Sequence, residues 1–382
     1  MKRRKTILVF GATGQRGGAV ASRLIGGGWN VRALARAPDG QNAQDLARQG
    51  VQVMQGDLGD EASIRRAMAG VYGVFSVQPS SGQGAAYNVT DEDEVRYGQT
   101  VARIALESGV RHLVYSSVNA AGPAKTGMGH FDSKAEIETY IRGLGLNATI
   151  VRPAAFMELL MLPGMGLDQG AFTFFLRPEQ TGQFMAVRDI GVIVAAIFAD
   201  HDRFVGRTIE IASDQVTGNE LARKLTGTAG KPIKYQRFPD ELLAETPFLG
   251  KLAALVDDGR LAGNAGLEAL RHEFGPLTTF DAWLSGPGKA LLAAAMHADH
   301  ADMALRQVPC PGIRWSRAAP CAPVSGSCDW CLIGIATCLS RPASGPSDYD
   351  HVVISGAWLC QGSKDRIWYG GTRWGKDDSG AV

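Results

Sequence analysis

The sequence predicts an α/β protein built on a Rossmann-type, doubly wound parallel sheet. Short apolar runs alternate with helical patterns up to about residue 152, a rhythm typical of parallel βαβ units. A glycine-rich turn, GATGQRGG at residues 11–18, stands between the first apolar run and the first helical pattern. The 382 residues also exceed the ~250–300 at which a single core stops growing. We therefore expect a smaller α+β unit after the sheet.

Six apolar runs are the candidate strands of this sheet. Helical patterns separate them, among them residues 94–108 and 132–143. Ligands of such sheets bind at the carboxyl ends of the strands. The expected strands are Thr6–Phe10, Asn30–Ala35, Val51–Met54, Val71–Val77, His112–Ser116 and Ala148–Val151.

The pattern changes after Arg152-Pro153. Loops rich in Met and Gly follow, with a helix expected at 190–199, a strand at 208–212 and a helix at 218–225. All six cysteines and five of the seven tryptophans lie beyond residue 300, where no period of 2 or 3.6 persists. The expected divisions are a Rossmann domain over 1–152 with part of 185–205 packing back on it, a smaller α+β cap over 153–288, and an irregular C-terminal tail over 289–382.

One motif in this tail has the spacing of a metal or redox site. Cys328-Asp-Trp-Cys331 matches a zinc knuckle or a thioredoxin-like pair. Cys338 stands at the wrong interval, no histidine cluster lies beside it, and the βαβ pattern of a thioredoxin fold is missing. We therefore expect no metal site in the tail.

The composition is that of an ordinary globular protein. The net charge is +1, with 45% hydrophobic and 20% charged residues, so nothing favours nucleic acid or a membrane surface as partner. The basic start MKRRK precedes an apolar run of only about five residues, whereas a signal peptide needs about 7–15. We expect a cytoplasmic protein.

The glycine-rich turn predicts dinucleotide binding. A GxxGxxG that follows a strand and opens a helix lets backbone N–H groups and the helix N-terminus face a pyrophosphate. The alternative is that the glycines serve only turn geometry and helix packing. Gly11 would allow the tight turn, Gly14 the approach of a phosphate, and Gly17 the packing of helix on strand. The loop is lined by Ala12, Thr13, Gln15 and Arg16.

The end of the second strand favours NADP over NAD. An NAD site places an acid there for the ribose 2′-hydroxyl, but the sequence VRALARAP has none before Asp39. Arg32 and Arg36 share a face of the strand, and Arg36 at its end suits a 2′-phosphate; two solvated surface arginines are the alternative. Two later strand ends would complete the site, with Asp57 and Leu58 at the adenine and Gln78 on the path to the nicotinamide.

Several motifs together resemble the NmrA-like branch of the atypical short-chain dehydrogenases. They are GATGQRGG, VRALAR (31–36), QGD (55–57), LVYSS (113–117), HFDSK (130–134), IVRPAAFMELL (150–160) and VRDIG (187–191), and the resemblance covers about residues 5–285. It implies a Rossmann-type NADP(H) site formed by Gly11, Thr13, Gly14, Gln15, Arg16, Arg36, Asp57, Leu58 and Gln78.

The resemblance also implies contacts around the nicotinamide. Lys134 and the segment from Phe156 through Met157 and Glu158 to Leu159 would flank the ribose and the ring. Arg96 falls where relatives that sense NADPH carry a basic residue near the cofactor, although a solvated helix position explains it as well.

The usual catalytic tyrosine of the short-chain dehydrogenases is replaced. In that family a tyrosine and a lysine four residues apart share one helix face, and the phenol donates a proton to the carbonyl oxygen. Four residues before Lys134 stands His130. Three interpretations remain open: Lys134 only holds ribose hydroxyls, Lys134 itself is the acid or base as in isoflavone-reductase-like relatives, or the His130 imidazole replaces the phenol. Ser117 occupies the family's hydroxyl position, and Tyr115 is expected in the core.

Two functions are therefore expected. The first is an NADP(H)-dependent oxidoreductase that moves hydride to a small conjugated or quinone-like acceptor. The second is a redox sensor that reads the NADPH to NADP ratio and regulates a protein partner; a homodimer is left open. The acidic run Asp91–Glu94 is interpreted as charge at a helix N-terminus rather than as a metal site.

Overall fold

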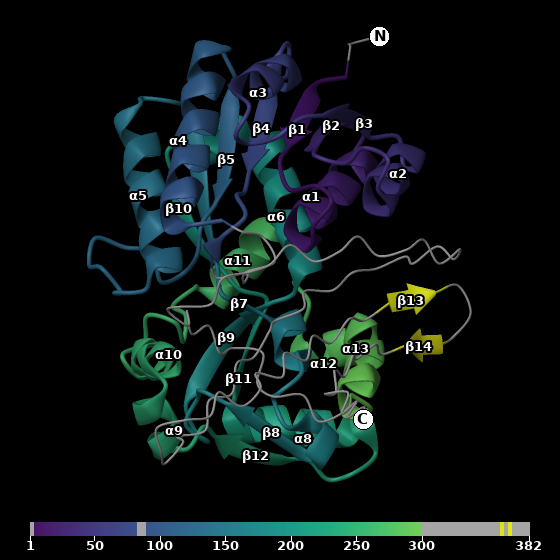
Figure 1. The fold of residues 1–382 in the computed structure, drawn as a ribbon, viewed down its shortest axis with the longest axis vertical. Coiled ribbons are helices and arrows are strands. Elements are labelled where there is room, and N and C mark those ends of the chain that lie inside the picture. The colour runs from purple at the N-terminus through teal and green to yellow at the C-terminus, as the bar shows by residue number, and fades with distance from the viewer. Residues whose placement is uncertain (1–3, 82–88, 299–359, 363–365, 369–382) are drawn as a thin grey trace, which may run out of the picture.

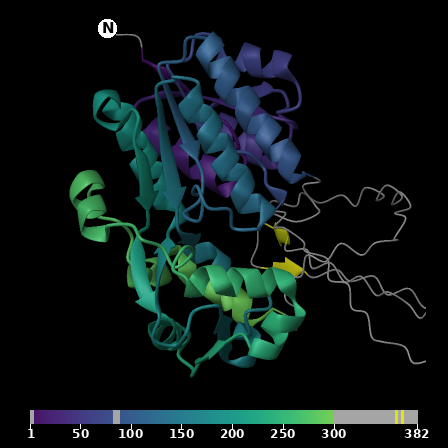
Figure 2. The ribbon, with the colours of Figure 1, turned by 90° about the vertical axis from the view of Figure 1, so that its left-hand side faces the viewer.

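A computed structural model describes residues 4–81, 89–298, 360–362 and 366–368. Figures 1 and 2 show two layers, a large parallel sheet with helices on both faces and, below it, a smaller α+β layer. The predicted Rossmann-type sheet with a smaller cap is confirmed. Cys328 and Cys331 lie outside the described residues.

The large sheet has seven parallel strands in the order β10-β6-β5-β4-β1-β2-β3. The strand order reverses between β1 and β4, which is where open α/β sheets bind their ligands. All six expected strands are present, and each observed end lies within two residues of the expected one. The strands are β1 (Thr6–Val9), β2 (Asn30–Ala35), β3 (Gln52–Gln55), β4 (Gly73–Ser76), β5 (His112–Ser116), β6 (Ala148–Pro153) and β10 (Thr208–Ile211).

The strand expected at 208–212 was placed in the cap, and this placement is wrong. β10 pairs with β6 in parallel, with Ile209 opposite Val151. The cause is α6 (Val187–Ala199), which packs along α1 (Gln15–Gly26) and so returns the chain to the edge of the large sheet. The expectation that part of 185–205 packs back on the Rossmann domain agrees with this position of α6.

Helices cover both faces of the sheet, and glycines allow the closest approaches. A Cβ on Gly191 of α6 would lie 2.4 Å from the carbonyl oxygen of Ala19 in α1, and one on Gly98 would lie 2.6 Å from Ile137. One face carries α1, α2 (Gln41–Arg48), α6 and α11 (Leu267–Phe274), and the other carries α3 (Glu61–Met68), α4 (Asp91–Glu107) and α5 (Gly129–Gly143). The short α7 (His201–Phe204) follows α6.

The smaller layer has its own core, which includes the fully buried Phe172, Phe280 and Trp283. Its strands form two sheets, one in the order β11-β9-β7 and one pairing β12 with β8. The strands are β7 (Ala155–Phe156), β8 (Ala171–Phe174), β9 (Thr181–Met185), β11 (Asp214–Thr217) and β12 (Lys234–Arg237). The helices are η3 (Met157–Met161), η4 (Leu167–Gln169), α8 (Gly218–Ala229), α9 (Asp240–Glu245), α10 (Pro247–Asp257), α12 (Phe280–Ser285) and α13 (Pro287–Met296). A separate antiparallel pair joins β13 (Cys360–Gly362) to β14 (Arg366–Trp368).

Helix α13 corrects the predicted start of the irregular tail. The sequence predicts irregular structure from 289, yet residues 287–296 are helical and Leu292 and Ala295 are buried against the core of the smaller layer. Pro287 suits the first turn of a helix because its missing N–H has no partner to lose there. The helix is too short for its apolar period to stand out in the sequence.

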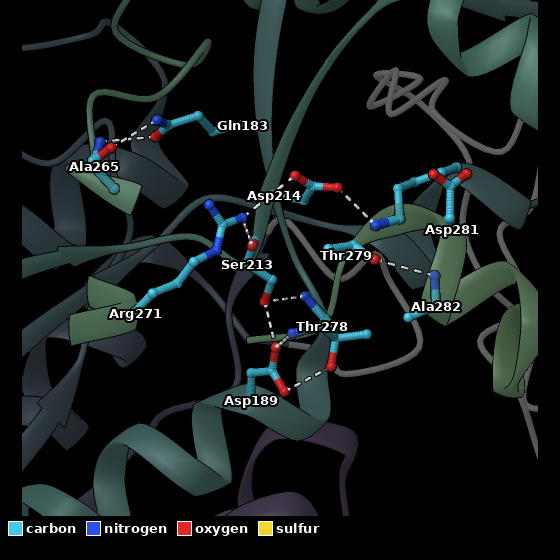
Figure 3. A network of polar contacts seen from close by, with 12 residues as sticks. Gln183, Asp189, Ser213, Asp214, Ala265, Arg271, Thr278, Thr279, Asp281 and Ala282 are labelled. Atoms are coloured by element: carbon cyan, nitrogen blue, oxygen red, sulfur yellow. Dashed lines mark hydrogen bonds and ion pairs between the residues drawn. The ribbon is translucent and has the colours of Figure 1, made fainter. Parts of the chain in front are cut away.

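A polar network ties the smaller layer to α6 (Figure 3). Asp189 at the start of α6 accepts hydrogen bonds from Ser213 Oγ at 2.8 Å and from the Thr278 backbone N–H and hydroxyl at 2.6 and 2.9 Å. Asp214, which follows Ser213 in the sequence, accepts a hydrogen bond from the Phe280 backbone N–H at 2.8 Å. The chain after α11 is therefore fastened beside the large sheet before it returns to the smaller layer.

Candidate functional site

The glycine-rich turn has the geometry that its sequence predicts. Gly11 has φ +63°, which glycine adopts without strain, and a Cβ there would lie 2.9 Å from Val77. A Cβ on Gly17 would lie only 2.3 Å from the Gly11 carbonyl oxygen. The tight turn at Gly11 and the close helix packing at Gly17 are therefore confirmed.

Gly14 differs from its two neighbours in the motif. It is the N-cap of α1 with extended backbone angles, and a Cβ there would meet only the Gly11 carbonyl oxygen, at 3.4 Å. Thr13, Gly14 and Gln15 are exposed, while Ala12 is buried. Within the described residues no side chain caps this helix. The positive end of α1 thus opens to solvent at the carboxyl edge of the sheet.

The two arginines of β2 have different surroundings. Arg32 donates to the Gln52 side chain and to the carbonyl oxygens of Ala67 and Ala69, at 2.6–2.9 Å. Arg36 follows the strand, is 72% exposed, and has its Nε 4.0 Å from a carboxylate oxygen of Asp57. Arg32 therefore fastens β2 to the end of α3, whereas Arg36 keeps most of its guanidinium accessible.

Buried polar atoms without a partner gather at the ends of β4 and β5. Gln78 is buried and donates from Nε2 to Ser76 Oγ at 2.8 Å, while its Oε1 accepts nothing from the described residues. The same holds for Ser116 Oγ and Asn119 Oδ1. An unsatisfied buried polar atom costs about 1–3 kcal/mol, so this edge of the sheet is prepared for a polar ligand or for water.

Tyr115 lies in the core, as its position in the strand predicts. Its side chain is buried between the sheet and the α4–α5 layer. Burial, followed by the charges of Glu94 and Glu138, raises the pKa of the Tyr115 phenol well above its usual value. This hydroxyl therefore stays protonated at any physiological pH.

Lys134 is buried in an ion pair that the sequence did not predict. Its Nζ donates to Glu94 Oε1 at 2.6 Å, to the His130 carbonyl oxygen at 2.8 Å and to Ser80 Oγ at 3.1 Å. Glu94 Oε2 accepts from the hydroxyls of Ser80 and Ser133 at 2.8 and 2.9 Å. Burial lowers the pKa of Lys134, and Glu94 opposes this effect.

The position of Glu94 in its helix distinguishes it from the rest of the acidic run. The run Asp91–Glu94 does open α4, with a capping box between Thr90 and Asp93, so its interpretation as a helix N-terminus is confirmed for these residues. Glu94 itself lies on the buried stripe that continues through Gly98, Val101 and Ala105. A charged residue at helical spacing with an apolar stripe indicates a buried partner, and this pattern would have singled it out.

His130 stands one turn before Lys134 against aromatic rings. The centre of its ring lies 4.0 Å from that of Phe131 and 5.8 Å from that of Phe248 in α10. Burial and then the charge of Lys134 lower the pKa of His130 to about 4. The imidazole is therefore neutral near pH 7.

The segment from Phe156 to Leu159 divides between the surface and the core. The Arg16 guanidinium lies 5.7 Å from the centre of the Phe156 ring, which brings the glycine-rich turn and the smaller layer together. Leu159 is 44% exposed, whereas Met157 has no exposed surface. Glu158 accepts from Trp283 Nε1 at 3.2 Å, and burial raises its pKa. Leu159 is thus the exposed member of the segment, while Phe156 and Glu158 are half-buried.

Arg96 lies on the outer surface of α4. It pairs with Asp93 and stacks over the Tyr97 ring at 4.7 Å. It lines a groove of about 660 Å³ between α4, α5 and residues 122–125. The structure therefore places Arg96 in this outer groove, apart from the contacts of the glycine-rich turn.

The model of the NmrA-like family matches residues 3–268 of the chain. The chain belongs to this family. Among the curated members, an NmrA-like family domain-containing protein of Dictyostelium discoideum is 26% identical over 301 residues, which cover 73% of this chain and 97% of the relative. The NmrA-like family domain-containing oxidoreductase FrzB of a Cladobotryum species is 30% identical, over 60% of this chain and 75% of the relative.

Two solved structures share the fold of this chain. NmrA, described as a negative transcriptional regulator in complex with NADP, is similar with a TM-score of 0.63 and 19% identity, covering 77% of this chain and 98% of the other. The NADPH-dependent quinone oxidoreductase QOR2 of Escherichia coli, complexed with NADPH, has a TM-score of 0.59 and 25% identity, covering 74% and 99%.

Among the described residues, no group of three His, Cys, Asp or Glu side chains is placed to hold a metal ion. None of the helices in the described ranges is long and apolar enough to span a membrane.

Proposed function

We propose that this NmrA-like protein binds NADP(H) at the glycine-rich turn and is an oxidoreductase that reduces a small conjugated or quinone-like acceptor. The observation that carries the proposal is the open, uncapped start of α1 behind Gly14, with Arg36 exposed at the end of the next strand. Relatives named as oxidoreductases, and neighbours solved with NADP or NADPH, support it.

The residues present fit the dinucleotide. No packing contact with the described residues requires a glycine at position 14. Space for a pyrophosphate would explain why a glycine stands there. The backbone N–H groups at the start of α1 and the guanidinium of Arg16 would hold the pyrophosphate, with Thr13, Gln15 and Ala12 lining the loop. Arg36 would pair with the 2′-phosphate, and Asp57 and Leu58 would border the adenine. The orphaned Oε1 of Gln78 would accept a hydrogen bond near the nicotinamide.

The acceptor would lie between Phe156, Leu159 and α5, where the smaller layer meets the large sheet. NADPH supplies the hydride when it is bound. Phe156 and the exposed Leu159 give this space an apolar wall that suits a flat conjugated molecule. Met157 and Glu158 would support that wall from within the core of the smaller layer rather than touch the acceptor.

Lys134 is the proposed proton donor, and His130 is the alternative. Lys134 is buried in an ion pair with Glu94, and burial lowers its pKa towards the range in which a lysine exchanges protons. His130 is neutral near pH 7 because its pKa lies at about 4, so it would accept a proton more readily than donate one. A role for Lys134 in binding alone is the third interpretation.

A redox sensor is the second candidate function. The observation in its favour is that His130 replaces the usual tyrosine while protein groups occupy all three donors of Lys134. NmrA itself is described as a negative transcriptional regulator. In this alternative the NADPH to NADP ratio would change the binding of a protein partner. A cytoplasmic location and a homodimer stay predictions.

Steady-state oxidation of NADPH with a panel of quinones and enones tests the enzyme proposal. We expect turnover with at least one acceptor and a slower reaction with NADH. A flat result across the panel, together with tight NADPH binding, would overturn the oxidoreductase and leave the sensor. An Arg96→Ala variant is a matched control, because it removes an exposed arginine outside the proposed site.

A further inference from the structure

The ammonium group of Lys134 has no donor to spare. A protonated lysine offers three N–H donors, and the three contacts are Glu94 Oε1 at 2.6 Å, the His130 carbonyl oxygen at 2.8 Å and Ser80 Oγ at 3.1 Å. The Lys134 side chain is only 8% exposed. A ligand hydroxyl can therefore bind to Lys134 only by taking the place of one of these partners.

The three partners differ in how readily they can be exchanged. Glu94 is a fully buried carboxylate, and without it the ammonium would lose its directly bound counter-charge. The His130 carbonyl belongs to the preceding turn of the same helix. Ser80 Oγ is neutral and the most distant of the three, and it also donates to Glu94 Oε2 at 2.8 Å. Ser80 thus keeps a partner when Lys134 turns away from it.

We infer that Glu94 is the positioning residue of Lys134 and that Ser80 occupies the place which a ribose hydroxyl of the dinucleotide takes on Lys134. This inference rests on the proposed NADP(H) site, since that site supplies the hydroxyl, and on the interpretation in which Lys134 binds the ribose. With the ribose hydroxyl in place of Ser80, all three donors of Lys134 are again in use, so Lys134 would not also contact the acceptor. Glu94 acts through Lys134 and does not touch the ligand itself. Its two roles are to hold the ammonium in one place and to keep it charged.

The charges around Lys134 give this role a measurable consequence. Glu94 and Asp91, both on α4, favour the charged ammonium, while burial and Arg16 at the start of α1 disfavour it. His130 on the same helix is neutral near pH 7. In Glu94→Gln, only Asp91 still favours the charged form of Lys134, while burial and Arg16 continue to disfavour it. Lys134 then loses its proton at a lower pH than in the wild type.

NADPH affinity as a function of pH tests the inference. Binding is followed by fluorescence between about pH 6 and pH 9, where an unperturbed lysine stays charged. We expect Glu94→Gln to bind like the wild type at the acid end and at least about tenfold more weakly at the alkaline end, as for one lost hydrogen bond to a charged group. At alkaline pH its affinity for NADPH should equal that of the Glu94→Gln, Lys134→Met double variant, which has no ammonium at any pH.

Two serine variants separate the roles within the cluster. Ser133→Ala removes a hydroxyl that donates to Glu94 but does not contact Lys134, so its pH profile should follow the wild type. Ser80→Ala should bind NADPH at least as tightly as the wild type, because it frees the third donor in advance. Weaker binding by Ser80→Ala would overturn the exchange, and a Glu94→Gln to wild-type ratio that is constant with pH would overturn the positioning role.

The titration of Lys134 itself distinguishes this inference from the proposed function. In protein labelled with ¹³C-lysine, the Cε signal of Lys134 is assigned by its absence from the spectrum of the double variant, which carries Lys134→Met. We expect this signal to titrate at lower pH in Glu94→Gln than in the wild type, whether or not NADPH binds. A wild type that fails to bind NADPH would overturn the proposed function. An unchanged titration would overturn the role of Glu94.

Discussion

The glycine-rich turn and the Lys134 cluster lie on the same edge of the sheet but are built in opposite ways. The turn is exposed and depends on backbone geometry, with Gly11 at φ +63° and Gly17 against the Gly11 carbonyl. The cluster is buried, and side chains from three separate segments satisfy one another through Lys134, Glu94 and Ser80. The first is ready to receive a ligand, whereas the second must give up a contact to meet one.

The largest expected effect comes from breaking the buried pair. Lys134→Met leaves the Glu94 carboxylate buried beside an apolar side chain, which costs about 3–5 kcal/mol when one partner of a buried ion pair is removed. Adding Glu94→Gln should recover most of this loss, because the buried charge is then gone. Urea denaturation measures both. A Lys134→Met variant as stable as the wild type would show that the pair contributes nothing to the fold.

A smaller loss of stability should separate Gly17 from Gly14 within the turn. Gly17→Val forces a side chain to within 2.3 Å of a carbonyl oxygen, and overpacking of this kind costs about 1–3 kcal/mol or more. A Cβ at residue 14 would meet only the Gly11 carbonyl oxygen, at 3.4 Å, and the extended backbone there suits valine, so the thermal midpoint of Gly14→Val should stay within a few degrees of the wild type. Equal losses in the two variants would contradict the distinction between packing and ligand roles.

The difference between the two regions also explains what the sequence could predict. The turn was found because each glycine has a local cause, a positive φ or a close backbone contact, that leaves a mark at fixed spacing. The Lys134–Glu94 pair joins residues 40 apart, and only the packing of α4 on α5 brings them together. The placement of β10 was wrong for the same reason, since its partner β6 is chosen by the path of α6 and not by its own sequence.

Substitution of Arg36 should change cofactor preference more than stability. In the proposed site Arg36→Asp would remove a charge-assisted contact to the 2′-phosphate, worth about 1.5–3 kcal/mol, and it adds a second acid beside Asp57. Affinity for NADPH should fall by at least about tenfold, while affinity for NADH changes little. Isothermal titration with both cofactors compares them in one protein. Equal losses of affinity for NADPH and NADH would show that Arg36 does not bind the 2′-phosphate.

The smallest expected effect concerns a buried group far from both regions. His112 at the start of β5 is fully buried, and burial followed by His201 lowers its pKa to about 4. Because this value lies below that of an unfolded histidine, its contribution to stability is complete above about pH 6.5 and is lost as the pH falls towards 4. We expect about 2 kcal/mol less stability at pH 5 than at pH 7 from this residue.

A His112→Phe variant checks this expectation. Phenylalanine keeps a ring against Phe198, and the Thr149 hydroxyl keeps its bond to the Phe204 carbonyl. The difference in unfolding free energy between pH 5 and pH 7 should therefore shrink by about the same 2 kcal/mol, whatever the absolute stability of the variant. An unchanged difference would mean that other groups determine the acid sensitivity.

The central claim is that the open start of α1 binds NADP(H), and titration of Gly14→Val with NADPH tests it most directly. The wild type and the variant should have the same circular dichroism spectrum, since a Cβ at residue 14 has room and the backbone there is extended. The account predicts that the wild type binds NADPH more tightly than NADH and that the variant binds neither. A folded Gly14→Val protein with wild-type affinity for NADPH would contradict it.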